Sequence, residues 1–411
     1  MIESRDRRVA EEDHMDTAAL ASRFELRYDP ANHRRVIAEK DVIIHCHHYN
    51  ARVQRTIEGT DMIDGKAIIR SSAEAVFAEQ IAAALREGDD AATKLAVAIG
   101  LYAHLGFGVL DFSTLAEGRV RATSSHYVEG WLAGFGTPER PVCSFAEGYI
   151  QAAVRVVDDR LVHARERACM AKGDPACVFE LDDARAESPA SDVKHEFEFS
   201  PKRRGEYLRS NNVDEQALID ALVAMPIHGN AEGLIPAFSV YLANTPADYY
   251  NLVCIRFVEA MAAKRRERAA KRMLIADGEI CAMNTFRGIM NSAEWDALVA
   301  PMIREPRDKM LALVAISNGL GWGNWHITHH PNPERISFES LNGYEAIGYG
   351  ERRGPAASPT CYMLTGVAAG LLELVYGSGA VEDRLGTCAT HESACICVGA
   401  PACSFEVERT A

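Results

Sequence analysis

The sequence predicts a fold of mixed helices and strands, arranged as two copies of one domain. Two observations carry this prediction. A pattern of one glutamate and two cysteines occurs near the middle of the chain and again near its end, and other landmarks repeat in the same order. We expect a flexible tail over residues 1–28, domains over 29–182 and 213–411, and a polar linker over 183–212.

The first domain should begin with a short apolar strand and continue as helices. Residues 91–105 have the apolar spacing of a helix, and the glycines Gly106 and Gly108 then end that helix and lead into a strand. The elements expected are a strand at 42–44, helices at 73–85 and 91–105, a strand at 109–112, a helix at 145–154 and a hairpin over 156–181.

The repeated glutamate and cysteine pattern is a candidate metal site. Glu166 and Cys169 precede a Gly-Asp-Pro turn and Cys177 follows it, so a β-hairpin would bring the three side chains together. In both copies the glutamate precedes the first cysteine by three positions, and the two cysteines are eight positions apart. The residues of the second copy are Glu392, Cys395 and Cys403.

A fourth ligand is available in each copy. Cys143 lies 23 residues before Glu166, and Cys361 has the corresponding place in the second copy. Three thiolates and one carboxylate form a closed tetrahedral set of the kind that zinc favours in structural sites. The alternative is that these cysteines are buried and pack as small hydrophobic side chains. Cys397 has no counterpart in the first copy, where Ala171 stands, and is either a spare thiol or a substitute ligand.

Further landmarks support a duplication. The motif Tyr49-Asn50-x4-Arg55-x2-Glu58 returns as Tyr250-Asn251-x4-Arg256-x2-Glu259, and a Leu-Gly-aromatic-Gly motif occurs at both 105–108 and 320–323. The offset between equivalent positions rises from 201 at the first motif to 226 at the second cysteine of the metal pattern. Duplication followed by insertions in loops would leave an offset that only grows.

Composition limits the class of protein. The 411 residues are 48% hydrophobic, which is enough for folded cores. A net charge of −14 and an isoelectric point near 5.5 argue against a nucleic-acid partner, which requires clustered lysine and arginine. We expect no membrane span, because no apolar run is long enough, and a cytoplasmic protein, because the start lacks the apolar core of a signal peptide. Eleven cysteines in a chain of this length favour reduced thiols and metal ligation over a disulfide framework.

The Cys-x22-Glu-x2-Cys-x7-Cys-x-Phe pattern resembles the 4-vinyl reductase-type domain family. These small-molecule-binding domains occur in bacteriochlorophyll biosynthesis proteins and in the sensor modules of phenol-responsive bacterial transcription activators. The resemblance implies structural zinc at Cys143, Glu166, Cys169 and Cys177, and by the internal repeat at Cys361, Glu392, Cys395 and Cys403.

The resemblance also implies an α+β fold, in which each domain is an antiparallel sheet packed with helices and closed by the zinc-binding hairpin. The chain has no Walker-type loop and no basic helix-turn-helix, so the ATPase and DNA-binding parts of the activators have no counterpart in it. Members of the family commonly pair as dimers, and a tandem could mimic such a dimer within one chain. A monomer, a homodimer and a protein partner therefore all stay open.

Residues specific to one copy are candidates for function, because residues needed only by the fold should recur. His45, His47 and His48 have Pro246, Asp248 and Tyr249 at the corresponding positions, and could hold an additional metal or transfer protons. Capping and hydrogen bonding where a strand meets a helix is the alternative. The candidates for contact with a flat ligand are His104, His126, Tyr127, Trp131, Trp322, Trp325 and His326, each of which could instead belong to the core.

Three functions follow from these residues. The first is a zinc-containing protein that binds a hydrophobic or aromatic small molecule and acts as carrier, sensor or accessory factor. The second is a metal-dependent oxidoreductase or reductase-like enzyme of aromatic or tetrapyrrole metabolism, using His45, His47 and His48. The third is an assembly subunit whose pockets no longer bind anything.

Overall fold

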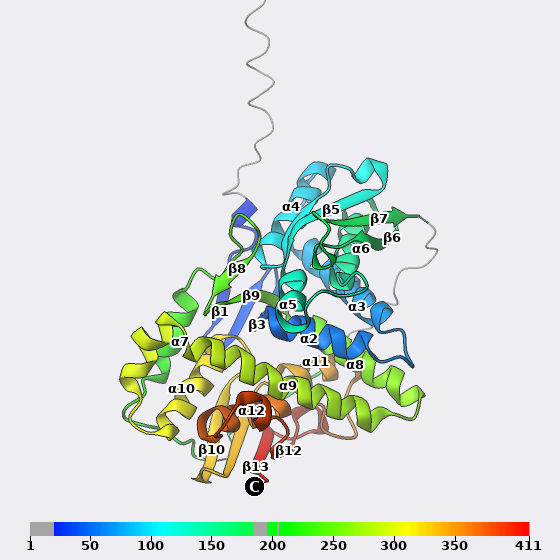
Figure 1. Ribbon diagram of the computed structural model, residues 1–411. Helices are drawn as coiled ribbons and strands as arrows, with labels where there is room; N and C mark the ends of the chain where they lie inside the picture. The colour runs from blue at the N-terminus through cyan, green and yellow to red at the C-terminus, as the bar shows by residue number, and fades with distance from the viewer. Residues whose placement is uncertain (1–19, 184–194, 204, 411) are drawn as a thin grey trace, which may run out of the picture.

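The computed structural model describes residues 20–183, 195–203 and 205–410 (Figure 1). The elements of the first half are β1 (Arg27–Asp29), β2 (Arg34–Ile37), β3 (Lys40–Cys46), α2 (His47–Glu58), α3 (Gly65–Ala84), α4 (Ala91–His104), β4 (Gly108–Asp111), β5 (Arg119–Ser125), α5 (His126–Phe135), α6 (Ser144–Asp158), β6 (His163–Ala168) and β7 (Cys177–Asp182).

The second half repeats this order after one additional helix, α7 (Glu215–Ala224). The repeating elements are β8 (Ile235–Ala237), β9 (Val240–Pro246), α8 (Ala247–Ala263), α9 (Glu267–Met290), α10 (Pro306–Gly319), β10 (Trp325–Asn332), β11 (Arg335–Ser340), α11 (Tyr344–Arg353), α12 (Tyr362–Tyr376), β12 (Cys388–Ala394) and β13 (Cys403–Arg409).

Each half contains a four-stranded antiparallel sheet with the same strand order. The first has the order β4-β5-β7-β6 and the second the order β10-β11-β13-β12. In each half the helix that follows the first cysteine ligand, α6 or α12, packs on the first strand of the hairpin, β6 or β12. The predicted α+β fold of two repeated domains is therefore confirmed.

A third sheet, with the order β1-β2-β3-β9-β8, joins the two halves. In the antiparallel pair β3–β9, Ile43 lies opposite Thr245 and Ile44 lies opposite Asn244. The repeat makes Ile43 equivalent to Asn244 and Ile44 equivalent to Thr245, so exchanging the copies maps this ladder onto itself. The halves thus meet across a local two-fold axis, as two subunits do in an isologous dimer.

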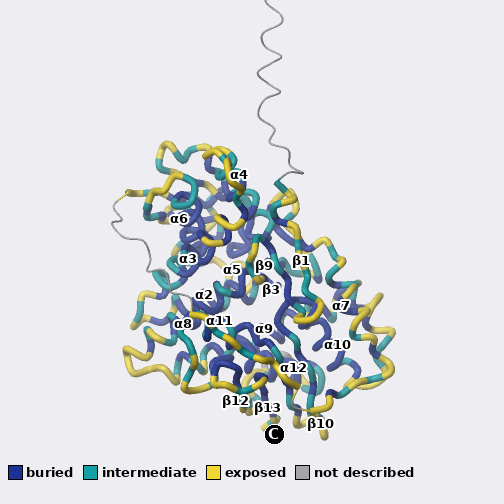
Figure 2. Tube along the Cα trace, turned by 180° about the vertical axis from the view of Figure 1, so that it is seen from behind, coloured by how far each residue is buried: buried dark blue, intermediate teal, exposed yellow. Residues whose placement is uncertain are grey.

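Helices are also shared across the junction. The first-half helix α2 packs on α9, and its equivalent α8 packs on α3. Arg52 of α2 binds Asp277 of α9 at 3.2 Å, and Arg256 of α8 donates to Ser71 of α3 at 2.9 Å. The buried side chains form one continuous core through both halves (Figure 2). Among the described residues, no helix is both long enough and apolar enough to cross a membrane.

The start of the chain is packed earlier than the sequence suggested. Of the predicted tail, residues 1–19 lie outside the described residues, as do 184–194 of the predicted linker. Phe24 is buried against Gly100 of α4, and Arg23 forms an ion pair with Asp89 at 2.5 Å. An aromatic side chain with a place in the core fixes this segment despite its charged neighbours. The other domain limits stay predictions.

Candidate metal centres and ligand cavities

The first cysteine cluster forms where the hairpin turns. Strand β6 leads through Cys169 into a single 3-10 turn at Met170–Lys172, and Gly173, with φ of 96°, sends the chain back to Cys177 at the start of β7. Cys143 immediately precedes helix α6 and completes the group. One ligand atom from each of Cys143, Glu166, Cys169 and Cys177 lies within 4.8 Å of every other, and all four residues are buried.

The second cluster repeats this geometry. Strand β12 leads through Cys395 into the turn Ile396–Val398, and Gly399 has φ of 93°. The sulfurs of Cys361 and Cys403 lie 3.6 Å apart, against 3.7 Å for Cys143 and Cys177 in the first cluster. The candidate ligands Cys361, Glu392, Cys395 and Cys403 again lie within 4.8 Å of one another. All eight predicted ligands therefore come together as two groups that could each hold a metal ion.

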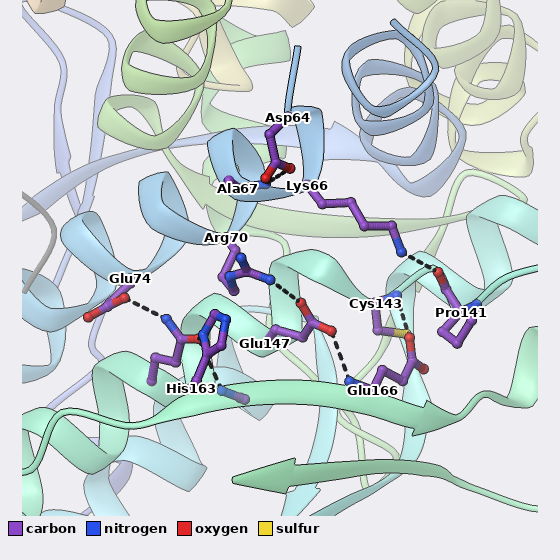
Figure 3. Close-up of polar contacts among 12 residues, drawn as sticks. Asp64, Lys66, Ala67, Arg70, Glu74, Pro141, Cys143, Glu147, His163 and Glu166 are labelled. Carbon is purple, nitrogen blue, oxygen red and sulfur yellow. Dashed lines mark hydrogen bonds and ion pairs between the residues drawn. The ribbon is translucent and has the colours of Figure 1, made fainter. Parts of the chain in front are cut away.

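Hydrogen bonds orient the ligands in the same way in both copies. The N–H of Cys143 donates to Oε2 of Glu166 at 2.7 Å, and that of Cys361 donates to Oε2 of Glu392 at 2.8 Å (Figure 3 shows the first pair). The other carboxylate oxygen, Oε1, is buried in each glutamate without a hydrogen-bond partner among the described residues. A buried carboxylate oxygen with no donor is costly, and a cation in the cluster would remove that cost.

The electrostatics of the first cluster also fit a bound cation. The thiols of Cys143 and Cys177 donate to the sulfur of Cys169 and lower its pKa to about 2. Burial and the charge of Cys169 raise the pKa of Glu166 to about 8. Several acidic groups thus compete for one negative charge, whereas a divalent cation would let them ionise together. The directions of the pKa shifts for Glu392 and Cys395 in the second cluster are the same.

A side-chain network holds the first hairpin against helices α3 and α6 (Figure 3). The carboxylate of Glu147 accepts a hydrogen bond from the backbone N–H of Glu166 at 2.8 Å and from Arg70 at 3.1 Å. Lys66 donates to the carbonyl of Pro141 at 3.1 Å, two residues before the first cysteine ligand. The cluster therefore lies at the point where two helices, the hairpin and the loop before α6 meet.

The three histidines do not converge on a metal site. His45 is fully buried, with Nδ1 3.4 Å from the sulfur of Cys281, whereas Nδ1 of His47 accepts the N–H of Tyr241 at 3.1 Å. His48 stacks beside His47, with ring centroids 4.0 Å apart. Helix α2 begins at His47, and this turn sends His45 away from the other two. In the described parts of the chain only the two cysteine clusters bring three or more candidate metal ligands together.

Most of the predicted ligand-contacting residues pack on other rings. Trp322 is buried and donates to the carbonyl of Ile44, Trp325 stacks on Phe405, and His126 lies 2.9 Å from Nδ2 of Asn50. The remaining pairs are His326 on Tyr207, His104 on His228, and Tyr127 on Phe145. These contacts are those of core and half-buried packing. Trp131 differs, because it lines a cavity.

The second half has a cavity of about 320 Å³ between α8, α11 and the loop before Cys361. Its wall includes aliphatic side chains of α8 and two tyrosine rings, together with a few polar groups. The principal lining residues are Asn251, Cys254, Val258, Tyr349, Thr360 and Tyr362. Tyr362 directly follows the ligand Cys361, so the cavity and the second cluster share a wall.

The first half has a more open cavity of about 450 Å³ at the equivalent place. It is lined by Arg55, Glu58, Trp131, Phe135, Pro141 and Val142. The repeat pairs Glu58 with Glu259, Trp131 with Tyr349, and Val142 with Thr360, each of which lines the other cavity. Sequence reasoning missed this pair of cavities, although the repeated Tyr-Asn-x4-Arg-x2-Glu motif contributes one wall of both.

Comparison with known proteins supports the predicted resemblance. Residues 131–182, which contain all four ligands of the first cluster, match the model of the 4-vinyl reductase-type domain. A solved structure, the phenol-responsive sensory domain of the transcription activator PoxR with phenol, aligns at 14% identity with a TM-score of 0.37, covering 48% of this chain and 90% of that one. No curated protein matches. The resemblance to the 4-vinyl reductase-type domain is confirmed for the region around the first cluster.

Proposed function

We propose that this protein binds a hydrophobic or aromatic small molecule in cavities whose walls are held by two structural zinc centres. In this role it would act as a carrier, a sensor or an accessory factor. The match of residues 131–182 to the 4-vinyl reductase-type domain and the paired cavities support the proposal. The cytoplasmic location and the choice among these three roles remain predictions.

The donor set favours zinc. Each cluster offers three cysteine sulfurs and one carboxylate oxygen, and sulfur-rich four-ligand sets are typical of structural zinc. Four protein ligands leave no coordination position for water, so zinc here would supply rigidity by linking the hairpin to the helix that follows the first ligand. Glu166 and Glu392 would each bind through the carboxylate oxygen that lacks a hydrogen-bond donor among the described residues.

The single observation that carries the proposal is the occurrence of equivalent cavities in both halves. Duplicated loops diverge freely unless something constrains them, yet Trp131 and Tyr349 place a large aromatic ring at the same position of each wall. The loop that follows each ring ends at a metal ligand, Cys143 or Cys361. A bound metal would therefore fix one side of each cavity.

The lining of the second cavity indicates the ligand class. The rings of Tyr349 and Tyr362, with Ile255 and Val258, offer planar and aliphatic surface, and Asn251 offers a polar group to orient a ligand. A volume of about 320 Å³ lies at the lower end of the range for small-molecule sites. A single-ring aromatic compound fits this space better than a tetrapyrrole, and we propose the former for the second cavity.

Thermal shift and calorimetry on the zinc-loaded protein test the proposal, with phenol, benzoate and a porphyrin as probes. We expect stabilisation by at least one single-ring compound, since a ligand that binds only the folded state raises its stability. Val258→Trp should fill the cavity and abolish binding. Ala263→Trp, at an exposed position at the end of the same helix, is the matched control and should bind normally. Equal binding by both variants, or no stabilisation by any probe, would overturn the proposal.

A further inference from the structure

The second cluster contains a thiol that the first does not. Cys397 is fully buried in the turn between the ligands Cys395 and Cys403, and its sulfur lies 3.3 Å from that of Cys395. The first copy has Ala171 at this position, in a turn of the same shape. The four ligand atoms that lie within 4.8 Å of one another come from Cys361, Glu392, Cys395 and Cys403, so the sulfur of Cys397 is a neighbour of the cluster.

The cavity of the second half gives small solutes a route toward this pair of sulfurs. Oγ1 of Thr360 lies 3.0 Å from the sulfur of Cys397 and 3.8 Å from that of Cys395. Thr360 is also part of the cavity wall. The two sulfurs are thus separated from a cavity of about 320 Å³ by one small side chain.

We propose that Cys395 and Cys397 form an oxidation site, at which peroxide-class oxidants convert the two thiols to a disulfide and the second centre loses its metal. The first centre, which has Ala171 in place of the second thiol, is not a target. The protein would then carry one permanent centre and one redox-responsive centre, and the responsive centre would share its wall with the ligand cavity.

The chemistry balances with hydrogen peroxide as the oxidant. The Cys395 thiolate attacks one peroxide oxygen, the O–O bond breaks, and a sulfenic acid and hydroxide form. The Cys397 thiol then attacks the sulfenic sulfur, the S–O bond breaks, and the oxygen leaves as water with the thiol proton. Each sulfur has been oxidised by one electron, and the two peroxide oxygens end as one water and one hydroxide.

The geometry explains why metal loss should follow. A disulfide bond of about 2.05 Å requires the sulfurs to move closer from their present 3.3 Å. Cys395 can no longer act as a thiolate ligand once its sulfur is bonded to Cys397. The remaining donors are Cys361, Glu392 and Cys403, an incomplete set for structural zinc. The shared wall at Thr360 would lose its support, so ligand binding in the second cavity should weaken with oxidation.

The test follows both disulfide formation and metal release in the full-length zinc-loaded protein. Hydrogen peroxide is added, released metal is read with a chromogenic chelator, and non-reducing peptide mass spectrometry identifies the disulfide. We expect loss of one of the two bound metals together with a Cys395–Cys397 disulfide, and recovery of the metal after reduction in the presence of added zinc.

Two variants exchange the property between the copies. Cys397→Ala reproduces the first copy and should retain both metals under the same treatment, whereas Ala171→Cys should make the first centre release its metal as well. Release from Cys397→Ala at the wild-type rate, or a free Cys397 thiol after the metal has left, would overturn the proposal. The release step rests on the proposed zinc assignment, but the disulfide does not. A protein purified without metal would contradict that assignment, and the mass measurement would still decide this proposal.

Discussion

Tyr250 of the second half donates its hydroxyl hydrogen bond to Oδ1 of Asn50 in the first half. Both side chains are buried, and both belong to the Tyr-Asn motif that the sequence repeats. Asn50 also reaches the His126 ring at 2.9 Å, while its equivalent Asn251 donates to the carbonyl of Tyr344 at 3.2 Å. The repeated asparagine therefore fixes the start of α5 or α11 in each copy, and in the first copy it also joins the halves.

Removing this contact should destabilise the protein. Tyr250→Phe leaves Oδ1 of Asn50 buried without its donor, which costs about 1 to 3 kcal/mol of unfolding free energy. The equivalent Tyr49→Phe is the matched control, because its hydroxyl donates to the sulfur of Met363, a weak acceptor. Urea unfolding should show the larger loss for Tyr250→Phe. Equal losses would mean that the hydrogen bond to Asn50 contributes nothing specific.

The close approach of α5 to α2 gives a second prediction. A Cβ on Gly130 would overlap the carbonyl oxygen of His47, so Gly130→Ala must push the two helices apart. We expect a loss of about 1 to 3 kcal/mol, the usual cost of overpacking. Gly134 lies on the same helix with nothing within 4 Å of its Cβ position. Gly134→Ala should be neutral or slightly stabilising, since alanine favours a helix. Similar melting of the two variants would contradict the tight packing of Gly130.

The metal ligands could be predicted from the sequence because local geometry places them together. Glu166, Cys169 and Cys177 lie within a dozen residues around one turn, and the turn residue Gly173 forces the chain to reverse. The second copy then confirmed the spacing independently. Cys143 required only that a helix should begin after it and pack on the hairpin.

The junction and the cavities could not be predicted in the same way. Strands β3 and β9 pair across about two hundred residues, and nothing in Val240–Pro246 marks its partner. The cavity residues are spread from Asn251 to Tyr362, and only the packing of α8 on α11 brings them together. The histidines misled us because a short spacing in sequence does not imply a shared direction where a strand turns into a helix.

Acid should destabilise the protein through His45. Burial lowers the pKa of this imidazole to about 3, below its value of 6.5 in the unfolded chain. Both states are neutral above pH 6.5, and below it the unfolded state binds a proton that the folded state does not. Stability is therefore lost as the pH falls from 6.5 toward 3, by about 2 kcal/mol for this group at pH 5.

The variant His45→Phe isolates that contribution. Phenylalanine suits the surrounding rings of Tyr49, Tyr250 and Trp322, and forfeits the long contact with Cys281. Urea unfolding at pH 7.5 and pH 5 should give a smaller difference for His45→Phe than for the wild type. Parallel losses in the two proteins would show that His45 is protonated in the folded state or is not buried.

Loss of one ligand should remove one metal and weaken one half of the protein. In Cys169→Ser the hydroxyl replaces the thiolate that has the lowest pKa of its cluster, so the first centre should be empty while the second remains filled. Metal analysis should then find half the wild-type content. The melting temperature should fall, because metal binding contributes folding free energy and the cluster joins the hairpin to α6 alongside the hydrogen bonds of Glu147 and Gln151. Cys388→Ser, at a half-exposed cysteine that is not a ligand, should keep both metals. If Cys169→Ser retains full metal content and unchanged melting, the cluster is a set of packed thiols, and the rigidity of the cavity walls must come from the hydrogen bonds of Glu147 and Glu166 alone.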